Sequence, residues 1–507
     1  MNAKKLAGIS RRFFEVLSSE AMVTSAVLAS FYALPIILFT KKNIHSMPIS
    51  EAVALLVASL LLGLAVVAVC FLLLRSWMKA AILAAVLAFP LLQYLDLKGW
   101  VTSALPIGDA VAVGLLFLVL PAGAFLLVKR LGFERTRMLA SYLAIVGPLI
   151  AAYSLAQISI SLVNNSGTTV TVDSEDLRST AVKPPERKPD IYYLVFDRYE
   201  GQIGLKESFD FDNSEFLDEL RSLGFYVADQ SFSNYPTTRP SLASSLNGGE
   251  LVVHGSEHIK SAKPLNPLFY EPAVAAFLKD KLDYSFAEIG SWGPDTQTSR
   301  IADRNPRPAW QIDFFGEHHL PYYSGIFLVG TAPGNAYDRY GGTNFSQYQS
   351  HGDIFLDQLD AIRQQAKHDE PTFVFSHLLM PHPPLVFDER GGPSDSGLPN
   401  DQRFLKQLQF TNNHILALVR DLLAQHKDDP PIIILAADEG EYEKLGEDQD
   451  LSNFSAGASD QALRKKTNIL AAFRFPGERH EDLYPTITPV NFFRVTFNEF
   501  FGTDLEL

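Results

Sequence analysis

The sequence predicts an α/β domain with a largely parallel sheet, preceded by a transmembrane region of five helices. Two observations carry this prediction. Long apolar runs fill the chain up to Val163, whereas the remainder mixes charge, aromatic residues, Gly and Pro as a globular domain does. Within that remainder, short β-branched or aromatic runs alternate with helical patterns, which is typical of an α/β sandwich.

Charge and cysteine content exclude some classes of function. The 507-residue chain has a formal net charge of −14, and its Lys and Arg residues form no dense tract outside the flanks of the apolar runs. This balance argues against a nucleic-acid partner. The single cysteine, Cys70, lies in an apolar run, so no disulfide framework can form within the chain.

Five apolar segments approach the roughly 20 residues that cross a bilayer. The third is short and ends in Gln93-Tyr94-Leu95-Asp96, which favours a tilted or partly interfacial helix. The segments contain almost no ionisable groups, so we interpret them as an anchor and not as a transport path. They are Ala21–Thr40, Ala52–Leu74, Ala80–Leu95, Ile107–Val128 and Met138–Val163.

Flanking cations predict the orientation. Lys and Arg cluster before the first segment, between the second and third, and between the fourth and fifth, which places those loops in the cytoplasm by the positive-inside rule. Everything after Val163 is then exported. Residues 1–20 carry Leu6, Ile9 and Phe13 among basic residues and are expected to form an amphipathic segment on the inner surface.

The exported part divides into a linker and a domain. Residues 164–188 are rich in Ser, Thr, Asn, Asp and Pro and predict an extended linker, so the domain is expected to span 189–507. Residues 292–344 are rich in Pro, Gly, Tyr and Arg and predict loops over a site or a lid. Strands are predicted at 190–196, 225–228, 284–290, 371–376 and 431–437, and helices at 214–223, 273–282, 353–367 and 403–426.

Acidic or imidazole groups follow three of these strands. Asp197 follows the first, His377 and His382 follow the fourth, and Asp438 with Glu439 follows the fifth. The carboxyl ends of such strands form the crevice where ligands bind, so these groups are expected to converge. Carboxylates crowded together repel unless a cation holds them. Metal ligands Asp197, Thr238, Asp438 and Glu439 would favour Mn²⁺, Mg²⁺ or Ca²⁺ over Zn²⁺.

Thr238 is the candidate nucleophile. It precedes Pro240, which suits a first helical turn, and Gly248 suits the residue past the helix end. A helix starting there would direct free N–H groups toward an anion, and a cation touching Thr238 would lower the pKa of its hydroxyl. The alternative from this segment alone is that Thr238 only caps the helix.

The two histidines are candidate catalytic residues with different alternatives. His382 or His377 can hold an oxyanion or protonate a leaving alcohol at neutral pH. His377 is equally compatible with a hydrogen-bonded core histidine. His382 lies between Pro381 and Pro383, in a rigid loop. Glu441 and Glu443 are expected to be solvated or to lie behind the ligands.

These motifs resemble the alkaline phosphatase/sulfatase superfamily, in its membrane-anchored branch with lipoteichoic acid synthases and phosphoethanolamine transferases. The resemblance runs from about Pro189 to the C-terminus and extends to the five spans. Thr238-Arg-Pro-Ser241 through Gly248 keeps the length of the sulfatase nucleophile motif, with Thr238 at the nucleophile position. Asp197 matches the first metal acid and His382 the substrate-binding histidine. Asp438-Glu439-Gly440-Glu441 is similar to the family's Asp-His-Gly-Glu.

Two departures from the family motifs bear on the reaction. Glu439 stands where the family has a metal-binding histidine, and Leu242 where sulfatases have an arginine that steadies formylglycine. Formylglycine cannot form from the threonine at position 238, so both departures lower the expectation of sulfate-ester hydrolysis.

The resemblance implies a bacterial inner-membrane enzyme with its catalytic domain on the periplasmic or outer face. Its expected activity is metal-dependent transfer of a phospho-head-group from a membrane lipid to an envelope glycan or lipid. Two alternatives remain. One is hydrolysis of sulfate or phosphate esters, and the other is a non-catalytic envelope assembly protein that retains the fold.

Overall fold

The computed structural model forms two compact units. A helical unit comprises residues 1–164 and 312–346, and an α/β unit comprises residues 165–311 and 347–507. The structure describes residues 20–43, 47–105, 107–164, 169–173, 177, 179–255, 263–291, 299–306, 313–314, 318–319, 322–340, 351–440 and 458–507. The expected amphipathic segment at residues 1–20 therefore lies, except for Glu20, outside the described residues.

The helical unit contains four helices long and apolar enough to cross a membrane, or five spans if a bent helix pair counts as one. The bent pair is the predicted third span: α4 and α5 meet at 84° around Gln93, where the apolar run gives way to polar residues. Of the five spans predicted, four are confirmed as single helices, and the bent pair makes the fifth if it is one span. The helices are α2 (Glu20–Asn43), α3 (Ile49–Leu74), α4 (Trp77–Leu92), α5 (Tyr94–Ala104), α6 (Asp109–Gly114), the π-helical turn η1 (Leu115–Val119), α7 (Leu120–Arg130) and α8 (Phe133–Asn164).

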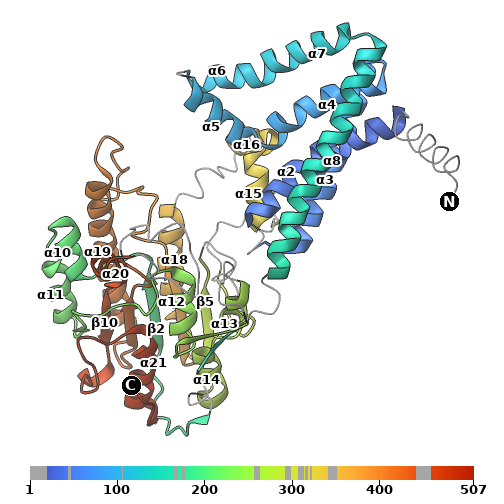
Figure 1. Ribbon diagram of the computed structural model, residues 1–507. Coiled ribbons are helices and arrows are strands. Elements are labelled where there is room, and N and C mark those ends of the chain that lie inside the picture. Colours follow the sequence, from blue (N-terminus) through green and yellow to red (C-terminus); the bar gives the residue numbers. More distant parts are fainter. Residues whose placement is uncertain are drawn as a thin grey trace, which may run out of the picture. The chain divides into compact units, whose positions relative to one another are not determined.

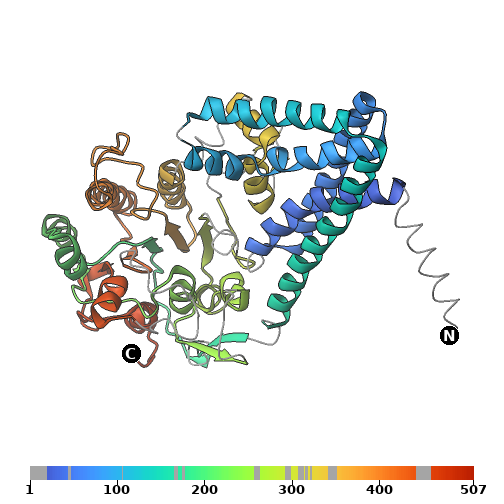
Figure 2. The ribbon, with the colours of Figure 1, turned by 45° about the horizontal axis from the view of Figure 1, so that its top comes forward.

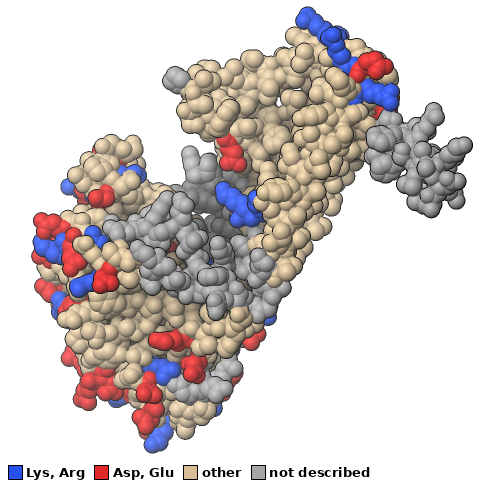
Figure 3. All heavy atoms as spheres, in the orientation of Figure 1, with Lys and Arg blue, Asp and Glu red and all other residues tan. Residues whose placement is uncertain are grey.

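The surface of the helical unit is apolar. Among the described residues, all exposed large hydrophobic side chains except Val252, Leu356 and Leu507 lie between Met22 and Val163. On the face that Figure 3 shows, charged side chains of this unit gather toward its ends and leave a broad uncharged surface between them. Such a surface is expected of helices that face lipid.

The α/β unit is built on a mixed six-stranded sheet with the order β3-β10-β9-β2-β8-β5 (Figure 1). The central strand β2 pairs in parallel with β8 and β9, and β5 pairs in parallel with β8, whereas β10 and β3 are antiparallel. The predicted mainly parallel sheet is confirmed. The strands are β2 (Ile191–Phe196), β3 (Tyr226–Val227), β5 (Ser285–Ile289), β8 (Thr372–Leu378), β9 (Ile432–Ala436) and β10 (Ala471–Arg474).

Helices cover both faces of this sheet. Neighbouring residues of β2 point to opposite faces: the Tyr193 ring packs edge-on against Phe493 of α21, and the Tyr192 hydroxyl bonds to His426 at the end of α19. β2 is fully buried, which explains its continuous apolar sequence. The helices are α10 (Gln202–Phe209), α11 (Ser214–Ser222), α12 (Thr238–Ser245), α13 (Asn266–Tyr270), α14 (Ala273–Leu282), α18 (His351–Gln365), α19 (Asn400–Gln425), α20 (Asp460–Thr467) and α21 (Pro489–Phe501).

Two predicted irregular stretches contain regular structure. In the linker interval, β1 (Thr169–Val172) pairs antiparallel with β4 (Leu251–His254). In the predicted loop interval at 292–344, α15 (Tyr322–Gly330) and α16 (Ala332–Tyr340) form two helices that group with the helical unit, so the expectation of loops is wrong for residues 322–340 (Figures 1 and 2). The apolar run of α15 is short, so the sequence there shows no long amphipathic pattern from which a helix could be predicted.

Candidate metal and catalytic site

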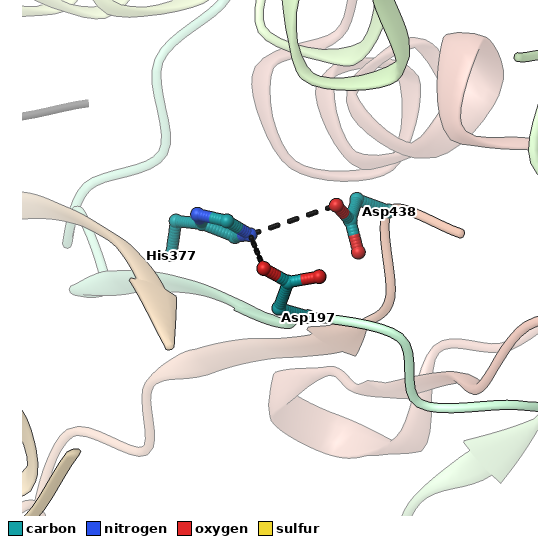
Figure 4. Close-up of side chains that lie close together, drawn as sticks. All are labelled: Asp197, His377 and Asp438. Carbon is teal, nitrogen blue, oxygen red and sulfur yellow. Dashed lines mark ion pairs between the residues drawn. The ribbon is translucent and has the colours of Figure 1, made fainter. Parts of the chain in front are cut away.

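Three neighbouring strands bring Asp197, His377 and Asp438 together (Figure 4). Asp197 directly follows β2, His377 lies at the end of β8, and Asp438 lies two residues past β9. His377 Nε2 lies 3.6 Å from Asp197 Oδ2 and 3.6 Å from Asp438 Oδ2. All three side chains are buried. The parallel register of β2 with β8 and β9 brings these three positions, which are distant in the sequence, into one cluster.

The donor atoms of this cluster fit a metal ion. One ligand atom from each residue lies within 4.8 Å of the others. Both carboxylate oxygens of Asp197, Oδ2 of Asp438 and both ring nitrogens of His377 have no hydrogen-bond partner among the described residues. Leaving so many buried polar atoms unsatisfied is costly, and a divalent cation would satisfy them. This buried Asp–His–Asp group can therefore hold a metal ion.

The two aspartates have different electrostatic environments. Burial, followed by the charges of Asp438 and Glu439, raises the pKa of Asp197 well above its usual value. Burial also opposes ionisation of Asp438, but the nearby imidazole of His377, the Thr238 hydroxyl and the Arg198 amide together lower the pKa of Asp438 to about 2. A cation between the two carboxylates would remove their mutual repulsion.

Thr238 is the first residue of helix α12, and its hydroxyl is near enough to Asp438 to be among the groups that lower the pKa of that carboxyl, after the imidazole of His377. The side chain is only partly buried, whereas the helix behind it is buried from Pro240 to Ser245. Gly248 follows with a φ of +62°, in the left-handed region that favours glycine. The structure thus joins Thr238 to the Asp–His–Asp group at the start of a helix, where N–H groups point outward.

Glu439 is held by two cations. Its Oε1 lies 2.7 Å from Arg198 Nε and its Oε2 lies 2.9 Å from Lys466 Nζ, and both Glu439 and Lys466 are almost fully buried. Arg198 also donates its backbone N–H to Asp438 Oδ1 at 3.1 Å, from a left-handed conformation with φ of +58°. The sequence-based role of Glu439 as a metal ligand stays a prediction. Arg198 and Lys466 were missed, although Arg198 directly follows Asp197.

His382 lies in a partly buried loop after β8. Its backbone N–H donates to the carbonyl oxygen of Asp197 at 3.1 Å, and its ring Nδ1 contacts the carbonyl of Pro383. Gln407, buried on α19, donates its side-chain amide to the carbonyl oxygens of Pro381 and His382 at 3.0 and 3.2 Å. The loop is therefore fixed beside Asp197, while the His382 ring is not a member of the Asp–His–Asp group.

Arg239, which follows Thr238, donates to Asn266 Oδ1 at 2.5 Å. Glu441 and Glu443 lie outside the described residues. The role of Gln407 could not be predicted from the sequence, because a glutamine that holds a loop has the same local pattern as any polar residue on a helix.

Comparisons with known proteins complete the description. No protein-family model and no curated protein matches the sequence. Similar solved structures include the integral membrane lipooligosaccharide phosphoethanolamine transferase A of Neisseria meningitidis, at 12% identity over 95% of each chain with a TM-score of 0.41. The C-terminal periplasmic domain of the phosphoethanolamine transferase EptC of Campylobacter jejuni is 11% identical over 63% of this chain and 91% of that one, with a TM-score of 0.39.

A third similar structure is the phosphonate monoester hydrolase of Agrobacterium radiobacter. It is 13% identical over 62% of this chain and 74% of that chain, with a TM-score of 0.34. The three similar structures are thus two phosphoethanolamine transferases and one phosphonate monoester hydrolase.

Proposed function

We propose that this chain is a membrane-anchored, metal-dependent transferase in which Thr238 takes a phospho-head-group from a lipid. The acceptor is an envelope glycan or lipid on the outer face of a bacterial inner membrane. The observation that carries the proposal is the place of Thr238: it begins α12, and its hydroxyl is near enough to Asp438 of the buried Asp–His–Asp group to help lower the pKa of that carboxyl. A hydroxyl so placed is suited to covalent catalysis.

Asp197, His377 and Asp438 are the side chains that would hold the ion, with the Thr238 hydroxyl beside them. A bound divalent ion would supply positive charge that lowers the pKa of the Thr238 hydroxyl and neutralises phosphoryl oxygens. Two carboxylates and one imidazole suit Mn²⁺ well, and the oxygen-rich set expected from the sequence favours Mn²⁺, Mg²⁺ or Ca²⁺ over Zn²⁺.

The residues of the chain have distinct roles in the proposed transfer. Thr238 Oγ1 forms a bond to the donor phosphorus while the bond from phosphorus to the lipid alcohol breaks. The proton that Thr238 loses is returned to the departing alcohol, with His382 as the candidate carrier. The N–H groups at the start of α12 stabilise the phosphoryl charge. A hydroxyl of the acceptor then attacks phosphorus, the bond from phosphorus to Thr238 Oγ1 breaks, and the proton of the acceptor hydroxyl passes to Thr238 Oγ1.

The test is a search for the covalent intermediate. The purified full chain is incubated with Mn²⁺ and a lipid extract labelled in the head-group phosphate, and the labelled peptide is mapped. We expect label on Thr238 and none on the Thr238→Ala variant. Thr237→Ala is the matched control, because Thr237 precedes Thr238 and makes no side-chain capping bond. Full turnover by Thr238→Ala would refute the covalent mechanism.

The two alternatives predict different results. Label that passes from Thr238 to water, and not to an envelope hydroxyl, indicates hydrolysis of phosphate esters, whereas hydrolysis of sulfate esters requires sulfate release from a sulfated substrate. A chain that binds no divalent ion and gains no thermal stability from Mn²⁺ or Mg²⁺ indicates a non-catalytic assembly protein.

A further inference from the structure

One part of the helical unit is a helical hairpin that lies, in the sequence, between two elements of the α/β unit. The chain leaves β5 of the α/β unit, contributes residues 312–346 to the helical unit, and returns to α18. The two helices of this segment, α15 and α16, form the hairpin that we call the α15–α16 hairpin. The proposed function explains neither its fold nor its place.

The α15–α16 hairpin is locally well defined. Thr331 forms its corner: the side-chain Oγ1 accepts the N–H of Gly334 at 3.1 Å, and the carbonyl oxygen accepts the N–H of Asn335 at 2.9 Å. A Cβ atom at Gly334 would lie 1.9 Å from the carbonyl oxygen of Leu328, so the close approach of the two helices requires glycine there.

The first contact between the hairpin and the transmembrane helices is polar. Glu51, in the first turn of α3, accepts two hydrogen bonds at its Oε2 from Ser324, one from the backbone N–H at 2.9 Å and one from the hydroxyl at 3.1 Å. Ser324 is 6% exposed. Because the first N–H groups of a helix lack internal partners, the Glu51 carboxylate satisfies the start of α15 and interacts favourably with its dipole.

The second contact is apolar. Phe327 is 7% exposed and packs in the same buried cluster as Ile36, Met47 and Leu55 of the helical unit. Its ring centroid lies 5.1 Å from that of Phe39, near the end of α2, in an edge-to-face arrangement. Burying a phenylalanine side chain contributes about 1.5–3 kcal/mol, and an edge-to-face pair adds about 1 kcal/mol.

Both contacts lie at one end of the helical unit. Phe39 is near the C-terminus of α2 and Glu51 near the N-terminus of α3, beside Lys41 and Lys42. Lys41 Nζ donates to Gln157 Oε1 at 2.5 Å, so the C-terminal part of α8 is at the same end. This is the end from which the chain continues past Asn164, and the cation pattern predicts that it faces outward.

We propose that the α15–α16 hairpin is a re-entrant anchor, which enters the outer end of the transmembrane helices and docks on α2 and α3 of the same chain. The α/β unit is then fastened to the membrane by the hairpin as well as by the segment after Asn164. A single linker would allow wide excursions of the α/β unit, whereas the second attachment restricts them. The inference does not depend on Thr238 chemistry.

Cysteine crosslinking tests the docking directly. Cys70 is the chain's only cysteine, so Cys70→Ala gives a background without thiols. Glu51→Cys with Ser324→Cys is oxidised in native membranes, and the joined peptides are quantified by mass spectrometry. We expect at least about tenfold more product than for a matched distant pair, because docking raises the effective concentration of the two thiols.

The distant control pair is Glu51→Cys with Glu134→Cys. Glu134 lies in the first turn of α8, 23 residues before Gln157, so it is about 35 Å along the helix from the end where α2 and α3 meet the hairpin. Equal yields from the two pairs would overturn the proposal. Within the docked pair, Phe327→Ala should lower the crosslinking yield and Phe327→Leu should restore most of it. An unchanged crosslinking yield in Phe327→Ala would show that Phe327 does not anchor the hairpin.

Discussion

The charges around the Asp–His–Asp group divide into two sets. Glu439 is neutralised by Arg198 and Lys466, whereas Asp197 and Asp438 face each other with His377 as their neighbour. The family resemblance expects an imidazole at position 439, and the structure supplies one from β8 instead. The presence of Glu439 where the family motif has histidine therefore need not abolish metal binding, because His377 can provide a nitrogen ligand.

Metal affinity of two variants tests this exchange. His377→Asn should weaken Mn²⁺ binding by at least about 100-fold, since even outer partners of metal ligands are worth roughly 10–100-fold. Glu439→Gln should leave the affinity within about threefold but lower thermal stability, because loss of one partner leaves buried cations uncompensated at a cost of about 3–5 kcal/mol. Calorimetric titration of the purified chain with Mn²⁺ measures the affinities, and thermal unfolding measures the change in stability.

The opposite ranking of these variants would reverse the assignment. If Glu439→Gln loses Mn²⁺ as completely as Asp197→Asn, while His377→Asn retains it, Glu439 is the ligand that the sequence indicated. His377 would then be a core histidine.

At the scale of elements, the turn after β9 is fixed by its contact with the last turn of α20 and with Asn468, which follows that helix. The N–H of Gly440 donates to the carbonyl oxygen of Lys466 at 2.7 Å. A Cβ atom at position 440 would lie 2.3 Å from the carbonyl oxygen of Lys465 and 2.8 Å from that of Asn468. Backbone atoms cannot rotate away as side-chain atoms can, so the turn that carries Asp438 and Glu439 has little conformational freedom.

Gly440→Ala should therefore displace the metal-binding turn. We expect a lower melting temperature together with weaker Mn²⁺ binding, because the added methyl group forces Asp438 away from Asp197 and His377. Gly397→Ala is the control, since its Cβ would meet only the exposed side chain of Asp395. A Gly440→Ala variant with the stability and affinity of the control would show that the turn is not constrained.

Local patterns predicted the strands that carry the site but not the contacts between them. β2, β8 and β9 are fully buried and largely apolar. The polar residues Asp197, His377 and Asp438 lie at or just past their carboxyl ends, which is why the sequence predicts that they converge. Lys466 could not be found this way, because its partner Glu439 lies on another element and no local period links them. β10 was missed because its four residues, Ala471–Arg474, are too few to show a period.

At the scale of the whole molecule, the cation clusters and the α15–α16 hairpin mark opposite ends of the helical unit. Cations cluster in alternate loops, including Lys129, Arg130, Arg135 and Arg137 between α7 and α8. The α15–α16 hairpin, which belongs to the sequence after Val163, docks at the opposite end, near Lys41. A chain with five spans places these two ends on opposite sides of the membrane.

Reporter fusions test this topology. A phosphatase that is active only after export should be active when fused behind Leu507 and inactive when fused behind Leu131, in the loop between α7 and α8. A fluorescent protein that folds only in the cytoplasm should give the reverse pattern. The same pattern for both fusion sites would mean an even number of crossings between them. In that case α8, the long apolar helix that the structure describes between Leu131 and the α/β unit, would have to lie on the membrane surface and not across it.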